Sequence, residues 1–223
     1  MFSLQLINKI ENINTDLIAY AAKGKRIFAT SSFQTHSIPL IHLLSKAEVA
    51  VDFYFLDTGF HFPETLTFRK EIETLLDVKF VTLRSPINKF NQRDNKGRLF
   101  FCSYSDYCCH INKVLPLEPI LHSHDIWISG VRKDQSKFRK NLAVEEKGKR
   151  DTLRYHPILD WNSKDIWNYR KEYDLPVHPL ENSGYLSVGC EPCTQKHIEG
   201  DRGGRWAGQN KTECGLHTTL IEK

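Results

Sequence analysis

Apolar residues near the start of the chain recur every three or four positions, which is the spacing of one helix face. This pattern covers residues 4–20 and stops at Lys23-Gly24-Lys25, so it predicts a helix. Residues 26–30 form a short apolar run that predicts a buried strand. A polar turn over residues 31–37 leads into an apolar stretch over residues 38–44, where the next helix is expected.

The alternation of strand and helix continues along most of the chain. Apolar runs predict further strands at residues 49–56, 78–83, 126–129 and 153–159. Helices are expected at residues 63–76, at residues 106–114 with Pro116 ending the helix, and from Asn162 or Ser163 through Tyr173.

Strands that alternate with helices predict an α/β fold with a parallel, doubly wound, twisted sheet. Ligands bind such sheets beyond the carboxyl ends of the strands, which places residues 31–37, 57–59 and 130–132 along one rim. Residues 176–223 lack periodicity and are rich in Gly, Pro, His and Cys. We expect them to form an irregular C-terminal lid on an α/β domain made of residues 1–175.

The composition excludes several classes of protein. With 40% apolar residues and 13 Phe, 8 Tyr and 4 Trp among 223 residues, the chain is not of the disordered class. A net charge of +4 does not indicate a general nucleic-acid binder, but it allows a local pocket for a small anion. The most apolar stretch, residues 49–56, is too short for a membrane span. Lys9, Glu11 and Asp16 fall where a signal peptide would be apolar, so a cytoplasmic protein is expected.

Six cysteines in a reducing compartment point to metal binding or catalysis. Cys108 and Cys109 are adjacent, and Cys190 and Cys193 form a C-x-x-C pair. Four thiolates suit a zinc ion or an iron–sulfur cluster. We favour a 4Fe-4S cluster, because an adjacent pair strains one tetrahedral ion but reaches two irons of a cube; the alternative is unrelated buried thiols. Cys102, alone among aromatic residues, is expected in the core.

Cys214 stands apart, in the run Glu213-Cys214-Gly215-Leu216-His217. The neighbouring Arg202, Arg205 and His217 would lower the pKa of its thiol and make it a nucleophile, whereas Glu213 would oppose them. From these residues alone, a nucleophile and a spare thiol remain open.

Three weaker signals lie elsewhere in the chain. Hydroxyls and backbone N–H groups of residues 31–37 can hold a phosphate, although serine-rich turns also serve as helix caps. Lys113 follows Cys109 by one helical turn, which would place it near that thiol or simply on the surface. Asp57 comes directly after a strand and suits either a turn or a contact with a ribose or adenine.

Taken together, these segments resemble the assimilatory sulfonucleotide reductases over most of the chain, from about Ile27 to His217. The matching segments are Ser31-Ser32-Phe33, Leu56-Asp57-Thr58-Gly59, Phe62-Pro63-Glu64-Thr65, Cys108-Cys109 with Lys113, Trp127 with Gly130-Val131-Arg132 and Gln135-Ser136, His156 to Trp161, Gly184-Tyr185, Ser187 to Thr194, Gly204-Arg205-Trp206 and Glu213 to His217.

The resemblance implies a nucleotide-binding sheet of the adenine nucleotide α-hydrolase-like type. Family members that reduce adenylyl sulfate carry both cysteine pairs and a 4Fe-4S cluster, whereas those that reduce 3′-phosphoadenylyl sulfate usually lack both pairs. The resemblance therefore implies an adenylyl-sulfate (APS) reductase of sulfate assimilation, with one cluster on Cys108, Cys109, Cys190 and Cys193.

In the mechanism that the resemblance implies, the Cys214 thiolate attacks the sulfonate sulfur and AMP leaves. Thioredoxin or a similar dithiol protein then releases sulfite from the S-sulfocysteine. The substrate-binding residues implied are Lys113, Arg132, Arg202, Arg205, His217, Ser31, Ser32, Phe33, Leu56 and Asp57. Nucleic acid and membrane are not expected partners, and a homo-oligomer is left open.

The turn departs from the family pattern at two positions. Gln34 replaces a common glycine, and His36 replaces an acidic or amide residue. Three alternatives stay open: a reductase of 3′-phosphoadenylyl sulfate or of both nucleotides, an ATP-using adenylating or thiolating enzyme of the same fold, and a nucleotide- or cluster-sensing protein without activity.

Overall fold

The computed structural model describes residues 2–196, 204–206, 211, 213–218 and 220, with residue 217 as backbone only. The described strands form one sheet in the order β3-β2-β1-β4-β6-β5, parallel except for the edge strand β5. Their bounds are β1 Ile27–Thr30, β2 Asp52–Asp57, β3 Phe80–Arg84, β4 Ile126–Ser129, β5 Glu145–Lys147 and β6 Leu153–Tyr155.

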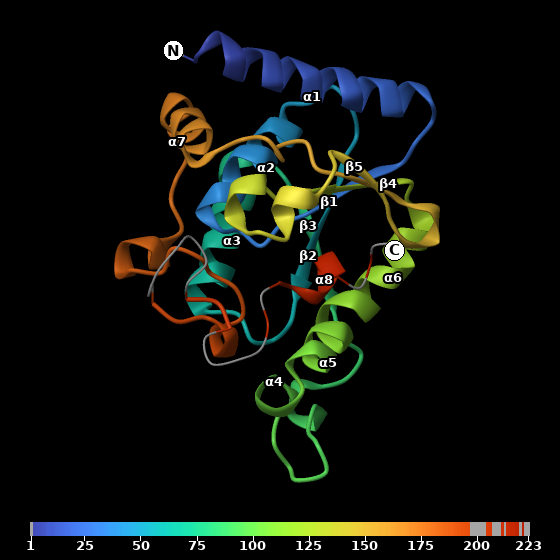
Figure 1. Ribbon diagram of the computed structural model, residues 1–223, viewed down its shortest axis with the longest axis vertical. Coiled ribbons are helices and arrows are strands. Elements are labelled where there is room, and N and C mark those ends of the chain that lie inside the picture. The colour runs from blue at the N-terminus through green and yellow to red at the C-terminus, as the bar shows by residue number, and fades with distance from the viewer. Residues whose placement is uncertain (1, 197–203, 207–210, 212, 219, 221–223) are drawn as a thin grey trace.

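Helices cover both faces of this sheet, with α2 and α3 on one side and α6 on the other (Figure 1). The α-helices are α1 Leu4–Ala22, α2 Ile38–Ser45, α3 Pro63–Leu76, α4 Phe100–Ser103, α5 Ser105–Cys109, α6 Leu115–Ser123, α7 Ser163–Glu172 and α8 Gly215–Thr218. The larger core lies under α1, α2, α3 and α7, and a second apolar cluster packs α6 on the opposite face. No described helix combines the length and apolarity needed to cross a membrane.

The order of the strands reverses at β1: β2 and β3 are added on one side of it, and β4 and the later strands are added on the other. In register, Thr30 pairs with Tyr54 on one side and with Ser129 on the other. The carboxyl ends of these three strands therefore meet at one edge, and the crevice beyond such a reversal is where open α/β sheets bind ligands.

The predicted α/β fold with a parallel sheet is confirmed, with several local differences. Strand β6 ends at Tyr155 instead of continuing to residue 159, and the short strand β5 was not predicted because Glu-Glu-Lys carries no apolar alternation. The prediction that Pro116 ends a helix is wrong, because that proline lies in the first turn of α6, where its missing N–H is tolerated.

The helix passes from α5 to α6 through a π-helical turn over His110–Val114. The N–H of Leu115 bonds the carbonyl of His110, five residues back. Such a turn shifts the side chains that follow around the helix, and turns of this kind are frequent at functional sites. This one contains Lys113.

Candidate active site

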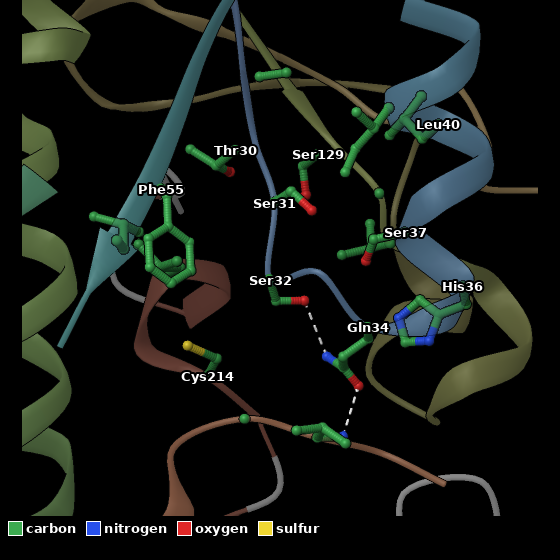
Figure 2. Close-up of a pocket in the computed structure, with 18 of the residues that line it drawn as sticks. Thr30, Ser31, Ser32, Gln34, His36, Ser37, Leu40, Phe55, Ser129 and Cys214 are labelled. Atoms are coloured by element: carbon green, nitrogen blue, oxygen red, sulfur yellow. Dashed lines mark hydrogen bonds between the residues drawn. The ribbon is translucent and has the colours of Figure 1, made fainter. Parts of the chain in front are cut away.

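The turn after β1 is shaped by Phe33, whose backbone is left-handed (φ 55°) and whose ring is fully buried against Phe55 and Phe80. A non-glycine residue in this conformation is uncommon, and the packed ring holds it in place. The Ser31 hydroxyl accepts a hydrogen bond from the Phe33 N–H at 3.1 Å. Ser31 and Ser32 line the crevice (Figure 2). The Phe33 ring lies in the core.

Gln34 joins this turn to the segment that precedes Cys190, as Figure 2 shows. Its amide nitrogen donates to Ser32 Oγ at 3.1 Å. Its amide oxygen accepts from the Val188 N–H at 3.0 Å and from the Ser187 hydroxyl at 3.2 Å. Gln34, which stands where the family commonly has a glycine, thus connects the turn to residues 187 and 188 through hydrogen bonds. The sequence analysis did not predict this connection.

The crevice is a cleft with about 1070 Å³ of empty space. It brings together six of the residues expected to bind substrate or react, namely Ser31, Ser32, Leu56, Lys113, Arg205 and Cys214. These residues come from the ends of β1 and β2, from the π-helical turn and from the C-terminal segment. The sheet therefore forms one wall of the cleft, and the C-terminal segment around Cys214 forms another (Figure 2).

Cys214, the expected nucleophile, lines this cleft. Lys113 Nζ lies 3.5 Å from Cys214 Sγ. A hydrogen bond from the Cys109 thiol lowers the pKa of the Cys214 thiol well below its usual range; burial opposes this, and Lys113 and Arg205 reinforce it. The same hydrogen bond raises the pKa of Cys109. Lys113 and Arg205 favour a thiolate at Cys214 in either state of Cys109, whereas the hydrogen bond from Cys109 exists only while that thiol keeps its proton and would be absent with a metal bound to it.

Two cations next to Cys214 are held by the protein. Burial lowers the pKa of Lys113, but the negative charges at Cys190 and Cys214 raise it by a larger amount. The net pKa is therefore above its usual value, and the ammonium keeps its proton. The Arg205 guanidinium donates to the Val188 carbonyl at 3.3 Å. A Cβ on Gly189 would overlap that guanidinium, so Gly189 permits its close approach.

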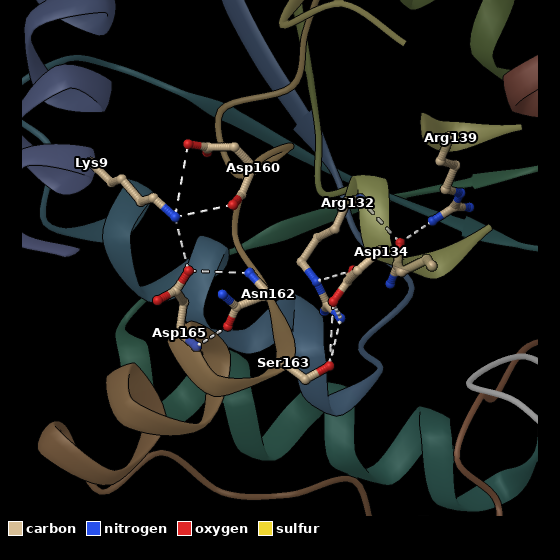
Figure 3. A network of polar contacts seen from close by, with 9 residues as sticks. Lys9, Arg132, Asp134, Arg139, Asp160, Asn162, Ser163 and Asp165 are labelled. Carbon is tan, nitrogen blue, oxygen red and sulfur yellow. Dashed lines mark hydrogen bonds and ion pairs between the residues drawn. The ribbon is translucent and has the colours of Figure 1, made fainter. Parts of the chain in front are cut away.

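Asp57 and Arg132 lie outside the cleft. Burial raises the pKa of Asp57, but the Gly59 N–H and Arg84 lower it more, so this carboxylate serves the turn after β2. Arg132 forms an ion pair with Asp134 at 2.9 Å and reaches Ser163 Oγ at 3.3 Å (Figure 3). Arg202 lies outside the described residues, and so does the side chain of His217.

Arg139 lines the cleft, although sequence reasoning missed it. Its guanidinium forms two hydrogen bonds of 2.8 Å with the carboxylate of Glu213. Glu213, expected to oppose a thiolate at its neighbour, is therefore neutralised by a buried cation. The only signal in the sequence was a basic residue close to Gln135-Ser136.

The four paired cysteines line one small cavity beside the cleft, with about 390 Å³ of empty space. Burial raises the pKa of Cys108 to about 11. Three polar groups lie near the sulfurs: Asn112 Nδ2 at 3.5 Å from Cys108, Thr58 Oγ1 at 3.3 Å from Cys190, and Lys211 Nζ at 3.3 Å from Cys109.

No cluster of three His, Cys, Asp or Glu residues placed to hold one metal ion occurs in the described part of the chain. Cys102 does not line the cavity and is exposed on α4, so the prediction that it packs in the core is wrong. In this short helix its neighbour Phe101 faces the cavity, which turns Cys102 toward solvent.

Sequence comparisons identify the family of this chain. Residues 26–196 match the phosphoadenosine phosphosulfate reductase domain, and the chain belongs to this family. The chain is 40% identical over 210 residues to the adenosine 5'-phosphosulfate reductase of Streptomyces coelicolor, covering 91% of this chain and 87% of the relative. It is 37% identical over 205 residues to the protein of that name from Geobacillus thermodenitrificans, covering 90% and 87%.

Solved structures share the fold. The phosphoadenylyl-sulfate reductase of Candida auris, in a phosphate complex, matches with a TM-score of 0.67 and 19% identity, over 86% of this chain and 97% of that one. The NH3-dependent NAD synthetase of Campylobacter jejuni matches with a TM-score of 0.54 and 12% identity, over 78% and 75%. The predicted adenine nucleotide α-hydrolase-like fold is confirmed.

Proposed function

We propose that this chain is an adenylyl-sulfate reductase, which converts adenylyl sulfate to sulfite and AMP in sulfate assimilation. The observation that carries the proposal is the position of Cys214, whose thiol lies in the cleft at the ends of β1 and β2 with Lys113 and Arg205 beside it. Relatives that share more than a third of the sequence carry the name of this activity.

The first step is a transfer of the sulfonate group. The Cys214 thiolate attacks the sulfonate sulfur, an S–S bond forms, the bond from sulfur to the bridging oxygen breaks, and AMP leaves with that oxygen. Thiolate and substrate are both anions, so the cations at Lys113 and Arg205 offset their repulsion. A donor placed where charge develops on the leaving phosphate contributes about 3 kcal/mol.

The second step restores the thiol. In the proposal, one thiolate of thioredoxin, or of a similar dithiol protein, attacks Cys214 Sγ and sulfite departs with the electron pair of the S–S bond. The second thiol of the reductant then resolves the mixed disulfide. Two electrons pass from the dithiol to the sulfur that leaves, and Cys214 returns as a thiol.

The nucleotide is placed by the chemistry of the cleft walls. Hydroxyls of Ser31 and Ser32 and the apolar side chain of Leu56 line the part of the cleft formed by the strands. We assign the nucleotide to that part and the sulfonate to the part near Cys214. Arg202 and His217 belong to the proposed set of cations on the basis of sequence alone.

We propose that Cys108, Cys109, Cys190 and Cys193 hold a 4Fe-4S cluster. Four thiols around one cavity, with polar groups near their sulfurs, fit the donor set of such a group. When bound, the cluster would neutralise the thiolates and fix the electric field around Lys113. The reaction steps above use the side chains of this chain and the external dithiol only.

Sulfite release with each nucleotide tests the proposal. The protein with thioredoxin should release sulfite from adenylyl sulfate, and should do so much more slowly from 3′-phosphoadenylyl sulfate. Cys214→Ser should release none, whereas the matched variant Cys102→Ser, at an exposed cysteine, should keep the rate. Faster release from the 3′-phosphorylated nucleotide, or activity in Cys214→Ser, would overturn the proposed function.

A further inference from the structure

The segment that carries Cys214 is fastened to the rest of the protein on both sides of the cysteine. On one side, the Glu213 carboxylate forms a bidentate ion pair with Arg139, in which Nε and one terminal nitrogen each donate at 2.8 Å. Both side chains are almost completely buried, with 2% and 6% of their surfaces exposed. Removing one partner of a buried pair with this geometry is costly, because the other charge then stays in the interior without its counter-ion.

The same carboxylate also orients the cysteine itself. Glu213 Oε1, which accepts from Arg139, accepts a hydrogen bond from the Cys214 backbone N–H at 3.0 Å. The Ser136 hydroxyl lies 3.5 Å from the other oxygen. One side chain thus ties the backbone of the nucleophile to the loop of residues 132–141, which also supplies a wall of the cleft.

On the other side of Cys214 the attachment is apolar. Leu220 is 1% exposed and packs in the cluster around Trp127, and its carbonyl accepts from the Lys149 N–H at 3.2 Å. Leu216 packs against the same cluster. Cys214 therefore lies between two attachments. The apolar one, at Leu216 and Leu220, would expose apolar surface to water if it came apart, whereas the groups of the Glu213–Arg139 ion pair can bind water once separated.

The two proposed steps make opposite demands on this segment. Attack on the sulfonate requires the thiol to lie in the cleft, whereas the dithiol of a second protein must reach the same sulfur afterwards. A group that keeps the Cys214 thiol in the cleft should therefore favour the first step and contribute nothing to the second.

We propose that Glu213 is a positioning residue, which holds Cys214 in the attacking position through its ion pair with Arg139 and its hydrogen bond to the Cys214 N–H. This inference rests on the proposed function, and it adds a role for a residue that does not touch the substrate. Release of the ion pair, with Leu220 still anchored, exposes the sulfur to the reductant.

Alkylation of Cys214 tests the role of the Glu213–Arg139 ion pair without any substrate. Glu213→Gln keeps the shape and an acceptor for the Cys214 N–H but removes the charge, and leaves the Arg139 guanidinium without its carboxylate, although its hydrogen bond to Gln135 remains. Cys214 in this variant should react with iodoacetamide about tenfold faster or more than in the native protein, measured at a pH where the thiol is fully ionised in both. Asp134→Asn, which breaks an ion pair in the same loop without touching the tail, should react at the native rate.

Single-turnover kinetics distinguish positioning from a general loss of structure. In Glu213→Gln, formation of S-sulfocysteine should slow about tenfold or more, whereas release of sulfite from the preformed adduct by dithiothreitol should not slow. The double variant with Arg139→Gln should lose no more than Glu213→Gln alone, because the two residues act as one unit. If Glu213→Gln folds poorly, Arg139→Gln provides the same two comparisons.

Three results would overturn the inference: native protection of Cys214 in both single variants, equal slowing of the two steps, or additive losses in the double variant. Failure of the proposed function has a different signature. In that case the native protein itself forms no adduct with adenylyl sulfate. The alkylation rates still show whether the Glu213–Arg139 ion pair limits access to Cys214.

Discussion

Lys113 Nζ and Cys214 Sγ lie 3.5 Å apart although 101 positions separate them in the chain. The π-helical turn presents the lysine, and the C-terminal segment brings the cysteine across the ends of the strands. The contact places a cation where a thiolate must approach an anionic substrate.

Replacing Lys113 by Ala should slow the first chemical step. The ammonium offsets the repulsion between thiolate and sulfonate, and loss of one such group costs about 100-fold in kcat. Rapid-quench measurement of adduct formation checks this. Lys133→Ala, at an exposed position of the loop after β4, is the control and should keep the native rate. A native rate in Lys113→Ala would show that the contact has no part in the reaction.

Gln34 should stabilise the fold through its amide oxygen. Gln34→Ala leaves the buried Val188 N–H without its acceptor, which should lower the free energy of unfolding by about 1–3 kcal/mol and raise KM. Gln34→Glu keeps an acceptor and should retain most of the stability. Urea unfolding of both variants checks the prediction, and equal losses in the two would contradict it.

The stability of the protein should fall in mild acid because His178 is buried in its neutral form. Burial lowers the pKa of His178 to about 4, from an ordinary value of 6.5, while Glu64 opposes the shift. The unfolded chain therefore binds more protons between these values, and stability is complete above pH 6.5 and falls as the pH drops to about 4.

Unfolding in urea across this range should show the slope, and His178→Gln should flatten it. His156, whose pKa burial lowers to about 3, would continue to contribute in that variant, so the slope should decrease without disappearing. An unchanged slope in His178→Gln would contradict the assignment.

Removal of one proposed cluster ligand should remove the iron. Cys193→Ser, purified without oxygen, should contain little iron or acid-labile sulfide and lack the visible absorption of a cluster. Cys102→Ser should contain the native amounts, because that thiol is exposed and does not line the cavity. A colourless native protein loaded with zinc would contradict the cluster assignment.

Local periodicity was sufficient for much of the fold. The expected bounds of α3 and β4 agree with the structure, since each is an apolar pattern with a clear start and end. The helix through Pro116 could not be predicted, because the π-helical turn depends on packing against the sheet. Strand β5 has no apolar pattern and exists only through its pairing with β6.

The position of the candidate nucleophile followed from the resemblance at residues 213–217, and the structure places the Cys214 thiol in the cleft. The partners of Arg132 and Arg139 were not predictable, because a guanidinium in this loop can turn to either side. Arg139 finds its carboxylate 74 positions away in the tail, whereas Arg132 bonds to Asp134 beside it. Phe33 matched the family motif, but its ring fills the core and its position shapes the turn.

The most direct measurement is mass spectrometry of the protein after incubation with adenylyl sulfate and no reductant. The account predicts a mass increase of one SO3 group, located on the peptide that contains Cys214 and lost when a dithiol is added. Release of AMP with no such adduct, or an adduct on a different cysteine, would contradict it.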